Sequence, residues 1–94
     1  MKNRDFIEKR IDELCDLLAA VDNREDIKAL FEDMCTYKEV EQMALRLYAA
    51  KLFAEGKTYT EIIAETELSS ATLSRVSRSL THGSGGYQKL CGRK

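Results

Sequence analysis

The feature that most restricts the fold of this chain is a segment that is apolar on nearly every side. It runs MALRLYAAKLFA over residues 43–54, and only Arg46 and Lys51 are charged in it. A helix that is apolar nearly all round has to be covered nearly all round. A chain of 94 residues has few other helices to supply that cover. The segment therefore predicts a second subunit, and we expect an obligate, intertwined homodimer.

Local signals mark the ends of this central helix. Thr36 and Glu39 have the T-x-x-E spacing of a capping box, and Gly56 suits a helix end, so the helix should extend to about Glu55. The residues of one stripe are Val40, Met43, Ala44, Leu47 and Ala54. The residues of the far side are Leu45, Ala49 and Leu52, with Tyr48 and Phe53 beside them.

Two helices are predicted ahead of the central one. Over about residues 4–20, apolar residues recur every three or four positions, at Ile7, Ile11, Leu14, Leu18 and Val21, with Phe6 next to them. This stripe fits packing within its own domain or packing on another subunit. Asp22, followed by Glu25, indicates the cap of the next helix. Its apolar face comprises Ile27, Leu30, Phe31 and Met34.

Residues 58–80, TYTEIIAETELSSATLSRVSRSL, predict two short helices joined by a tight turn. Thr58 and Glu61 repeat the capping-box spacing, so the first of them should begin there. Its expected inward residues are Ile62 and Ile63, and its expected end lies at Thr66 and Glu67.

The second helix of this pair has an apolar face and a polar, basic face. Leu73, Val76 and Leu80 share one side, Leu68 should turn into the core, and Ser69 should cap the helix. The opposite side carries Ala71, Ser74, Arg75 and Arg78. Small residues, hydroxyls and guanidinium groups on one helix face suit the major groove of DNA. Two short helices with a serine-capped turn also occur in proteins that bind no nucleic acid.

The distribution of charge favours DNA binding. Residues 1–35 carry six basic and ten acidic side chains, residues 36–67 carry four and six, and residues 68–94 carry five and none. The three sums, −4, −2 and +5, add up to the formal charge of −1. The overall charge says nothing about DNA. However, the basic segment, residues 68–94, contains the second of the two short helices, which we take as the candidate recognition helix.

Several classes of protein do not fit this sequence. No run approaches the roughly 18 apolar residues that span a bilayer, and the first residues lead into no signal-type apolar core, so we expect a cytoplasmic protein without a membrane partner. Cys15, Cys35 and Cys91 are odd in number and lack a C-x-x-C pair, which predicts reduced thiols. A lone His82 adds no case for a metal. We expect no enzyme, because the chain has no Ser/His/Asp arrangement and no phosphate-cradling glycine loop ahead of a helix.

The C-terminal tail, residues 83–94, is rich in glycine. The three glycines between His82 and Tyr87 should end the recognition helix and permit positive φ. Tyr87 and Leu90 are expected to anchor a short last turn, and residues 92–94 should fray. The sequence thus predicts an all-α chain of five or six helices forming one domain over residues 1–94.

Three segments resemble the Trp-repressor-like proteins, most closely the small YerC/YecD-type branch. They are EGKTYTEI at the end of the central helix, SSATLSRVSRSL, and the HGSGGY that follows. The similarity covers roughly residues 22–90, and S-x-A-T-L-S-R-V with the subsequent G-S-G-G-Y is its most specific part. The resemblance implies an interleaved, all-helical homodimer in which a helix-turn-helix, here about residues 58–80, reads one half-site of double-stranded DNA. It implies a sequence-specific transcriptional regulator.

The resemblance also implies which residues contact DNA. Ser70, Ala71 and Thr72 match positions that meet base edges, with Ser69 as the cap. Such small groups give weak direct readout, so water-mediated and shape-based recognition should contribute. Phosphate contacts are expected from Thr60, Ser74 and Arg78. The full predicted DNA-binding set is Thr60, Ser69, Ser70, Ala71, Thr72, Ser74, Arg75 and Arg78.

A possible effector pocket follows from the same resemblance. The tryptophan repressor holds its co-repressor between two arginines, which Arg46 and Arg75 match, while Thr36 and Ser79 match two polar residues of that pocket. The chain departs from the pattern at Val76, where the repressor has a glycine beside the indole. It departs again at Asp33 and Cys35, which stand where the repressor lines part of this pocket with leucine. We therefore expect no cofactor and no tryptophan co-repressor, so Arg46 and Arg75 would serve as intersubunit or phosphate-facing residues.

A second class of function remains open. The chain could be a protein-interaction module that keeps the helix-turn-helix shape as a scaffold without binding DNA. The net charge of −1 and the weak base-reading chemistry of residues 70–72 motivate this alternative. Retention of DNA at low salt would distinguish the two.

Overall fold

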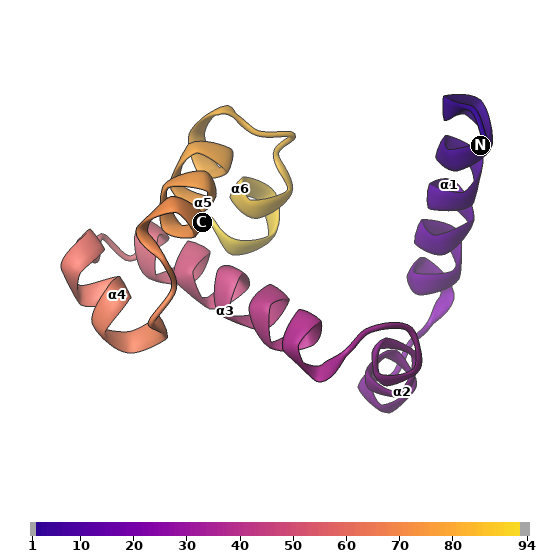
Figure 1. The fold of residues 1–94 in the computed structure, drawn as a ribbon, viewed down its shortest axis with the longest axis horizontal. Helices are drawn as coiled ribbons and strands as arrows, with labels where there is room; N and C mark the ends of the chain where they lie inside the picture. Colours follow the sequence, from indigo (N-terminus) through magenta and orange to yellow (C-terminus); the bar gives the residue numbers. More distant parts are fainter. Residues whose placement is uncertain (1, 93–94) are drawn as a thin grey trace. The chain divides into compact units, whose positions relative to one another are not determined.

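The computed structural model describes residues 2–92, and every regular element in that range is an α-helix (Figure 1). Its elements are α1 (Arg4–Ala20), α2 (Arg24–Met34), α3 (Tyr37–Ala54), α4 (Tyr59–Thr66), α5 (Ser70–His82) and α6 (Gly86–Cys91). The all-α prediction is confirmed. Arg93 and Lys94, for which fraying was predicted, lie outside the described residues. Among the described helices, none has the length and hydrophobicity that a membrane crossing requires.

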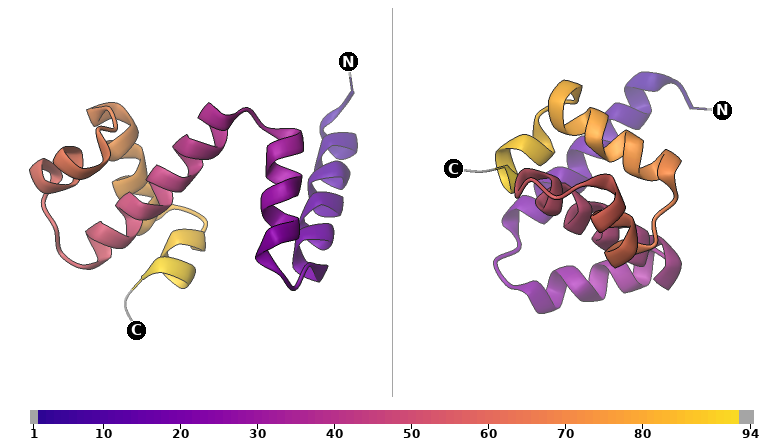
Figure 2. Two further views of the ribbon diagram at one scale, coloured as in Figure 1. Left: turned by 90° about the horizontal axis from the view of Figure 1, so that it is seen from below. Right: turned by 90° about the vertical axis from the view of Figure 1, so that its left-hand side faces the viewer.

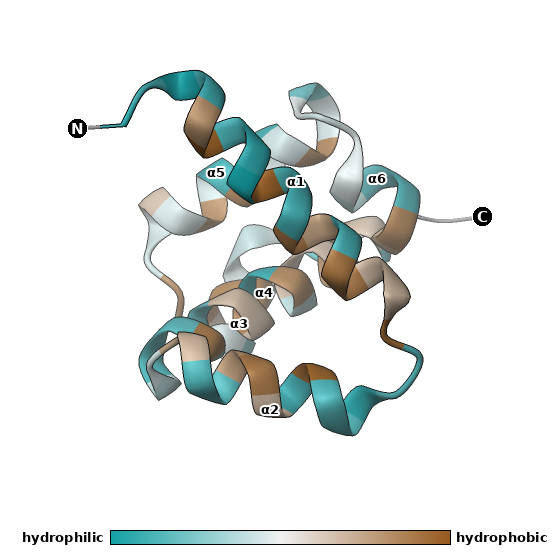
Figure 3. Ribbon diagram, turned by 90° about the vertical axis from the view of Figure 1, so that its right-hand side faces the viewer, coloured by the Kyte–Doolittle hydropathy of each residue, from teal (hydrophilic) through white to brown (hydrophobic). Residues whose placement is uncertain are grey.

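The chain divides after Thr36 into two compact units. The first unit contains α1 and α2, and neither helix has a buried residue. Hydrophobic and hydrophilic residues alternate along both helices (Figure 3). The exposed large apolar side chains of α1 are Phe6, Ile7, Ile11, Leu14 and Leu17. The predicted α1 stripe therefore exists, and much of it is left open to solvent.

The cap of α2 is Asn23, so the prediction of Asp22 was wrong. The Asn23 side chain accepts the backbone N–H of Asp26 at 2.9 Å, and the helix begins at Arg24. Asparagine and aspartate cap helices about equally well. Two adjacent candidates therefore compete, and the extended backbone at Asn23 (φ −140°, ψ 149°) selects the second.

The second unit is built on α3, which packs against α4, α5 and α6. These three helices gather around the C-terminal half of α3 (Figure 2). The buried core consists of Ala49, Ala50, Leu52, Ile62, Leu68, Leu73 and Val76, with Leu45, Phe53, Leu80, Tyr87 and Cys91 packed against it. Ala49 and Ala50 are completely buried, so small side chains let the neighbouring helices approach α3 closely.

One side of α3 is not covered by the other helices of its unit. The side with Ala49 and Leu52 lies in the core. Leu47 and Tyr48 are instead 44% and 43% exposed, and Ala44 is exposed as well. The ends of α3 agree with the prediction to within one residue, and Gly56 after it has the left-handed φ of 89° expected at a helix end.

Two side chains that were predicted to point inward are exposed. Ile63 is 37% exposed, because successive helix residues differ by about 100° and the short α4 contacts the core mainly through Ile62 and Thr66. Leu90 is 81% exposed, because Tyr87 and Cys91, four residues apart on α6, take the core-facing side.

The glycine loop after α5 also differs from expectation at its first residue. Gly83 ends α5 with an ordinary φ of −87°, and positive φ occurs at Gly85 instead, at 98°. Gly83 is required for another reason: a Cβ there would lie 2.5 Å from the backbone oxygen of Ser79. His82 is exposed at the helix end, as predicted.

Candidate nucleic-acid interface

The beginning of α4 is fixed by the predicted capping box. The Glu61 carboxylate accepts the backbone N–H of Thr58 at 2.9 Å, and the Thr58 hydroxyl oxygen accepts the backbone N–H of Glu61 at 3.2 Å. The first of these bonds holds the pKa of Glu61 below its usual range, because it favours the ionised carboxylate. The rings of Phe53 and Tyr59 meet edge to face at 5.3 Å, which packs the first turn of α4 against α3.

The turn between α4 and α5 is held by a buried threonine. The Thr66 hydroxyl donates to the backbone oxygen of Ile62 at 2.8 Å and accepts the backbone N–H of Leu68 at 3.2 Å. Glu67 adopts a left-handed conformation with φ 59° and ψ 21°, and its N–H donates to the oxygen of Ile63 at 2.8 Å. Leu68 is buried, as predicted, so the direction in which α5 starts is set by packing as well as hydrogen bonds.

The first turn of α5 is closed by two bonds between Ser69 and Thr72. Ser69 accepts the backbone N–H of Thr72 at 3.1 Å, which confirms the predicted cap, and its hydroxyl donates to the Thr72 hydroxyl oxygen at 3.0 Å. Leu73 and Val76 are buried beneath this turn. Thr72 is therefore half-buried and oriented, while its own hydroxyl proton remains available to an outside acceptor.

The outer face of α5 presents the predicted polar residues to solvent. Ser70, Ala71, Ser74, Arg75 and Arg78 are all exposed, and the helix contains no acidic residue. In the part of the chain that the structure describes, neither arginine forms an ion pair. This face therefore offers unpaired positive charge together with small hydrogen-bonding groups.

The start of α4 adds two further exposed groups near the same helix pair. Thr60 lies exposed in the first turn of α4, and its contact with phosphate stays a prediction. Lys57, just before that helix, is exposed too, and the sequence analysis did not single it out. Its place in E-G-K-T, between a helix-ending glycine and a capping threonine, was the signal that could have identified it.

A side-chain hydrogen bond joins α4 to the middle of α3. The Tyr48 hydroxyl donates to the Glu65 carboxylate at 2.7 Å. The bond and the adjacent negative charge raise the pKa of Tyr48 above its ordinary value of 10.0. From the sequence, Tyr48 was predicted only to lie beside an apolar side of the central helix, because no local pattern indicates a partner so far along the chain.

Three of the four predicted effector-pocket residues line one cavity of about 310 Å³. They are Arg46, Arg75 and Ser79, and they are joined there by Thr72, Val76 and Tyr87. Thr36, the fourth, belongs to the other unit and stays a prediction. Thr72 could have been added from its spacing of seven residues to Ser79, whereas Tyr87 follows a glycine loop whose course the sequence does not reveal.

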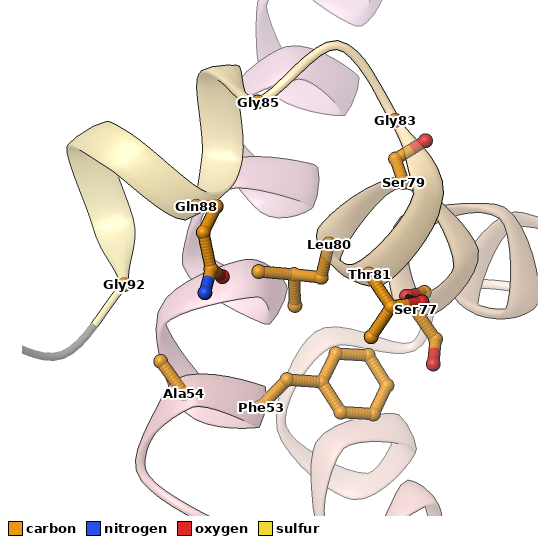
Figure 4. A pocket seen from close by; sticks show the side chains of 10 residues that line it. All are labelled: Phe53, Ala54, Ser77, Ser79, Leu80, Thr81, Gly83, Gly85, Gln88 and Gly92. Atoms are coloured by element: carbon orange, nitrogen blue, oxygen red, sulfur yellow. Dashed lines mark hydrogen bonds between the residues drawn. The ribbon is translucent and has the colours of Figure 1, made fainter.

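A second cavity, of about 780 Å³, lies among α3, α5 and α6 (Figure 4). Phe53 and Leu80 form its apolar floor, while Ser77, Thr81 and Gln88 supply polar groups. At 100° per residue, Ser77 and Thr81 lie on the edge of α5 opposite to Thr72 and Ser79. The side chains that line this cavity carry no charge, so it lacks the guanidinium pair of the smaller one.

Cys15, Cys35 and Cys91 are free thiols. Between residues 2 and 92, no three potential metal ligands come together.

Comparison with known proteins finds the same fold and related sequences. Residues 9–94 match the family described as Trp repressor protein. The uncharacterized protein YerC of Bacillus subtilis (strain 168) is 38% identical over 80 residues, covering 85% of this chain and 77% of YerC. A crystal structure of a candidate Trp repressor from Staphylococcus aureus has 39% identity and a TM-score of 0.82, covering 87% of this chain and 82% of that one. A TrpR-like protein from Eubacterium eligens ATCC 27750 has 32% identity and a TM-score of 0.84, covering 94% and 91%.

Proposed function

This chain belongs to the Trp repressor protein family as a YerC-type member, and on that premise we propose that it is a sequence-specific, DNA-binding transcriptional regulator acting as a homodimer. The observation that carries the proposal is the outer face of α5, which exposes hydroxyls and two unpaired guanidinium groups and contains no acidic residue. The proposed motif is a helix-turn-helix formed by α4, residues 67–69 and α5. In this proposal the chain is a regulator and not an enzyme.

In this proposal the N-terminal half of α5 enters the major groove. Ser70, Ala71 and Thr72 meet base edges there, where hydroxyls bond several bases and small apolar groups contact the thymine methyl. Thr72 is the best oriented of the three, because Ser69 holds both its backbone N–H and its hydroxyl oxygen. Arg78 lies at the centre of the exposed face and is assigned to phosphate.

Arg75 has a different surrounding from Arg78. It is exposed and also lines the cavity that contains Arg46, on the edge of α5 marked by Thr72 and Ser79. A guanidinium at this edge can neutralise a phosphate of the backbone or hold an anion in the cavity. Arg75 therefore belongs to both predicted sets, and its loss should affect more than DNA affinity alone.

The homodimer is supported by apolar surface that the chain leaves open. Within residues 2–92, the buried core has seven apolar residues, two of them alanines, whereas twelve large apolar side chains are exposed. The α1 stripe and the uncovered side of α3 around Leu47 account for much of this surface. On each helix, exposed apolar surface of this kind is typical of a protein interface. A second copy would cover it and would present two α5 helices to the two halves of one site.

The DNA-binding proposal is tested by selecting duplexes with the purified protein and measuring affinity by fluorescence anisotropy across salt concentrations. We expect steep salt dependence, because bound lysines and arginines release counterions from DNA. Arg78→Glu should weaken binding to all sequences and reduce the salt slope, whereas Thr72→Ala should act mainly on the preferred site. Lys89→Glu, the same charge reversal on α6, is the matched control. Equal binding by the parent, Arg78→Glu and Thr72→Ala would refute the proposal.

The same experiment distinguishes DNA binding from the alternative function, a protein-interaction module. A dimer that shows no retention of any duplex at low salt, yet binds a defined protein, would be an interaction module built on this fold. Against that outcome, the exposed Arg75 and Arg78 of the α4–α5 pair have no acidic partners in the described chain, which favours DNA binding.

Subunit association has its own test in sedimentation. Ile11→Asp places a charge in the α1 stripe and should shift the protein toward monomer, because a charge cannot be buried unpaired without a large cost. Asp12→Ala, an exposed neighbour outside the stripe, should leave the sedimentation coefficient unchanged. A compact single subunit for the parent at micromolar concentration would rule out the dimer.

We further propose that free tryptophan is not the co-repressor. Val76 is buried in the core and also lines the cavity between Arg46 and Arg75, so its side chain occupies part of the space that an indole would need. The test is DNA affinity measured with and without millimolar tryptophan. Equal affinities are expected, and a clear gain with tryptophan would overturn this proposal without affecting the DNA-binding one. The cytoplasmic location stays a prediction.

A further inference from the structure

The turn between α4 and α5 contains an unusual backbone conformation. Among the described residues, Glu67 is the one residue other than glycine with positive φ, at 59°. The left-handed region crowds the Cβ of an L-residue against its own backbone, and glycine occupies it without that cost. Glutamate at this position therefore carries conformational strain that glycine would remove.

Glu67 also lies close to the start of α5, the proposed recognition helix. It precedes the cap of α5 by two residues, so its Cα lies within about 7.6 Å of that of Ser69. Its side chain is exposed, and no ion pair neutralises it in the described chain. It is the last acidic residue of the sequence, directly before the basic segment.

We propose that Glu67 limits the affinity of this protein for DNA through its charge, while its backbone strain keeps the turn less stable than glycine would make it. This inference rests on the proposed DNA-binding function. Phosphates surround the N-terminus of a recognition helix in a groove, and a carboxylate there repels them whatever the base sequence. A repulsive group of this kind weakens binding to non-target DNA, whose affinity is electrostatic, and so shortens its residence there.

Two variants separate the charge from the strain. Glu67→Gln removes the charge and keeps a side chain with the same backbone demands, whereas Glu67→Gly removes both. A carboxylate and a phosphate about 8 Å apart in water repel each other enough to change affinity about twofold per protomer, or about fivefold per dimer. Glu32→Gln, which removes an exposed carboxylate on α2 in the other unit, is the matched control.

The measurements are affinity for a selected duplex and for a non-target duplex at several salt concentrations, with thermal unfolding at one protomer concentration. Both Glu67 variants should bind both duplexes about fivefold more tightly at low salt, and the gain should shrink as salt screens the charge. Only Glu67→Gly should raise the melting temperature.

The outcomes are distinguishable. If the parent binds DNA but Glu67→Gln binds no more tightly than Glu32→Gln, this inference is wrong and the proposed function stands. If the parent and all variants bind no duplex, both are wrong. If Glu67→Gly is no more stable than Glu67→Gln, the strain half of the inference is overturned.

Discussion

Replacing Ser69 by alanine should separate the folding of α5 from its orientation toward DNA. The substitution removes the acceptor for the Thr72 backbone N–H and the donor to the Thr72 hydroxyl, which lie 3.1 and 3.0 Å away. Loss of an N-cap serine destabilises a protein by about 1 kcal/mol, with a range of roughly 0.5–2 kcal/mol. In a chain of this size, that loss lowers the melting temperature by about 4–8 °C.

Thr58→Ala is the matched control for stability. It removes the N-cap of α4, whose hydroxyl oxygen accepts the backbone N–H of Glu61 at 3.2 Å, and its expected cost is again about 1 kcal/mol. Ser69→Asn is the rescue variant, because asparagine caps helices about as well as serine. The three variants therefore separate the general loss of stability that follows when any helix cap is removed from the specific loss of the Ser69 cap, which orients Thr72.

The assays are thermal unfolding at one protomer concentration and DNA anisotropy well below every melting temperature. Ser69→Ala and Thr58→Ala should unfold at similarly reduced temperatures, and Ser69→Asn should stay close to the parent. Only Ser69→Ala should lose affinity for the preferred site, because Thr72 and the first turn of α5 lose their fixed orientation. The reasoning is refuted if the two alanine variants weaken DNA binding equally, or if Ser69→Ala leaves the melting temperature unchanged.

Three further predictions concern stability. Leu73→Ala should cost about 2–5 kcal/mol in urea unfolding, because the side chain is completely buried, whereas the exposed neighbour Ser74→Ala should stay within about 0.5 kcal/mol of the parent; similar losses for both would contradict the described core. Tyr48→Phe should be less stable than the parent at neutral pH. The difference in stability should disappear as pH rises from 10.0 through the raised pKa of Tyr48, because the folded parent then loses the proton that it binds more tightly than the unfolded chain does. If urea unfolding still shows the difference at high pH, the bond to Glu65 is not its source. Glu61→Gln should be less stable than the parent above pH 4.5, and the two should converge as pH falls through the lowered pKa of Glu61, where the carboxylate takes up a proton; parallel pH profiles would exclude the capping box as the cause.

The helix boundaries were predictable because they depend on neighbours along the chain. Thr58 with Glu61 and Ser69 with Thr72 are three residues apart, so the bonds that start α4 and α5 form within one turn. Local signals were less decisive where two candidates stood side by side. Asp22 and Asn23 are both good caps, and the path of the chain between α1 and α2 selected Asn23.

Which apolar residues become buried was predictable for α5 and only partly for the shorter helices. Leu73 and Val76 recur with helical spacing and are buried, since a helix of this length has a defined inward side. Ile63 and Leu90 were assigned inward from hydrophobicity alone and are exposed. On a helix of one or two turns, only a narrow stripe of residues contacts the core. Which residues form that stripe depends on where the rest of the unit lies.

By itself, the sequence determined that the chain is helical, where α3, α4 and α5 start, and that the outer face of α5 is basic, because periodicity, capping and charge act between near neighbours. Only the tertiary structure decided that Tyr48 bonds Glu65, that Tyr87 joins Arg46 and Arg75 in their cavity, and that Glu67 takes a left-handed turn. These relations join residues on different helices or depend on how two helices must meet. Their physical cause is the close packing of α4, α5 and α6 on α3, which fixes distances that no local pattern contains.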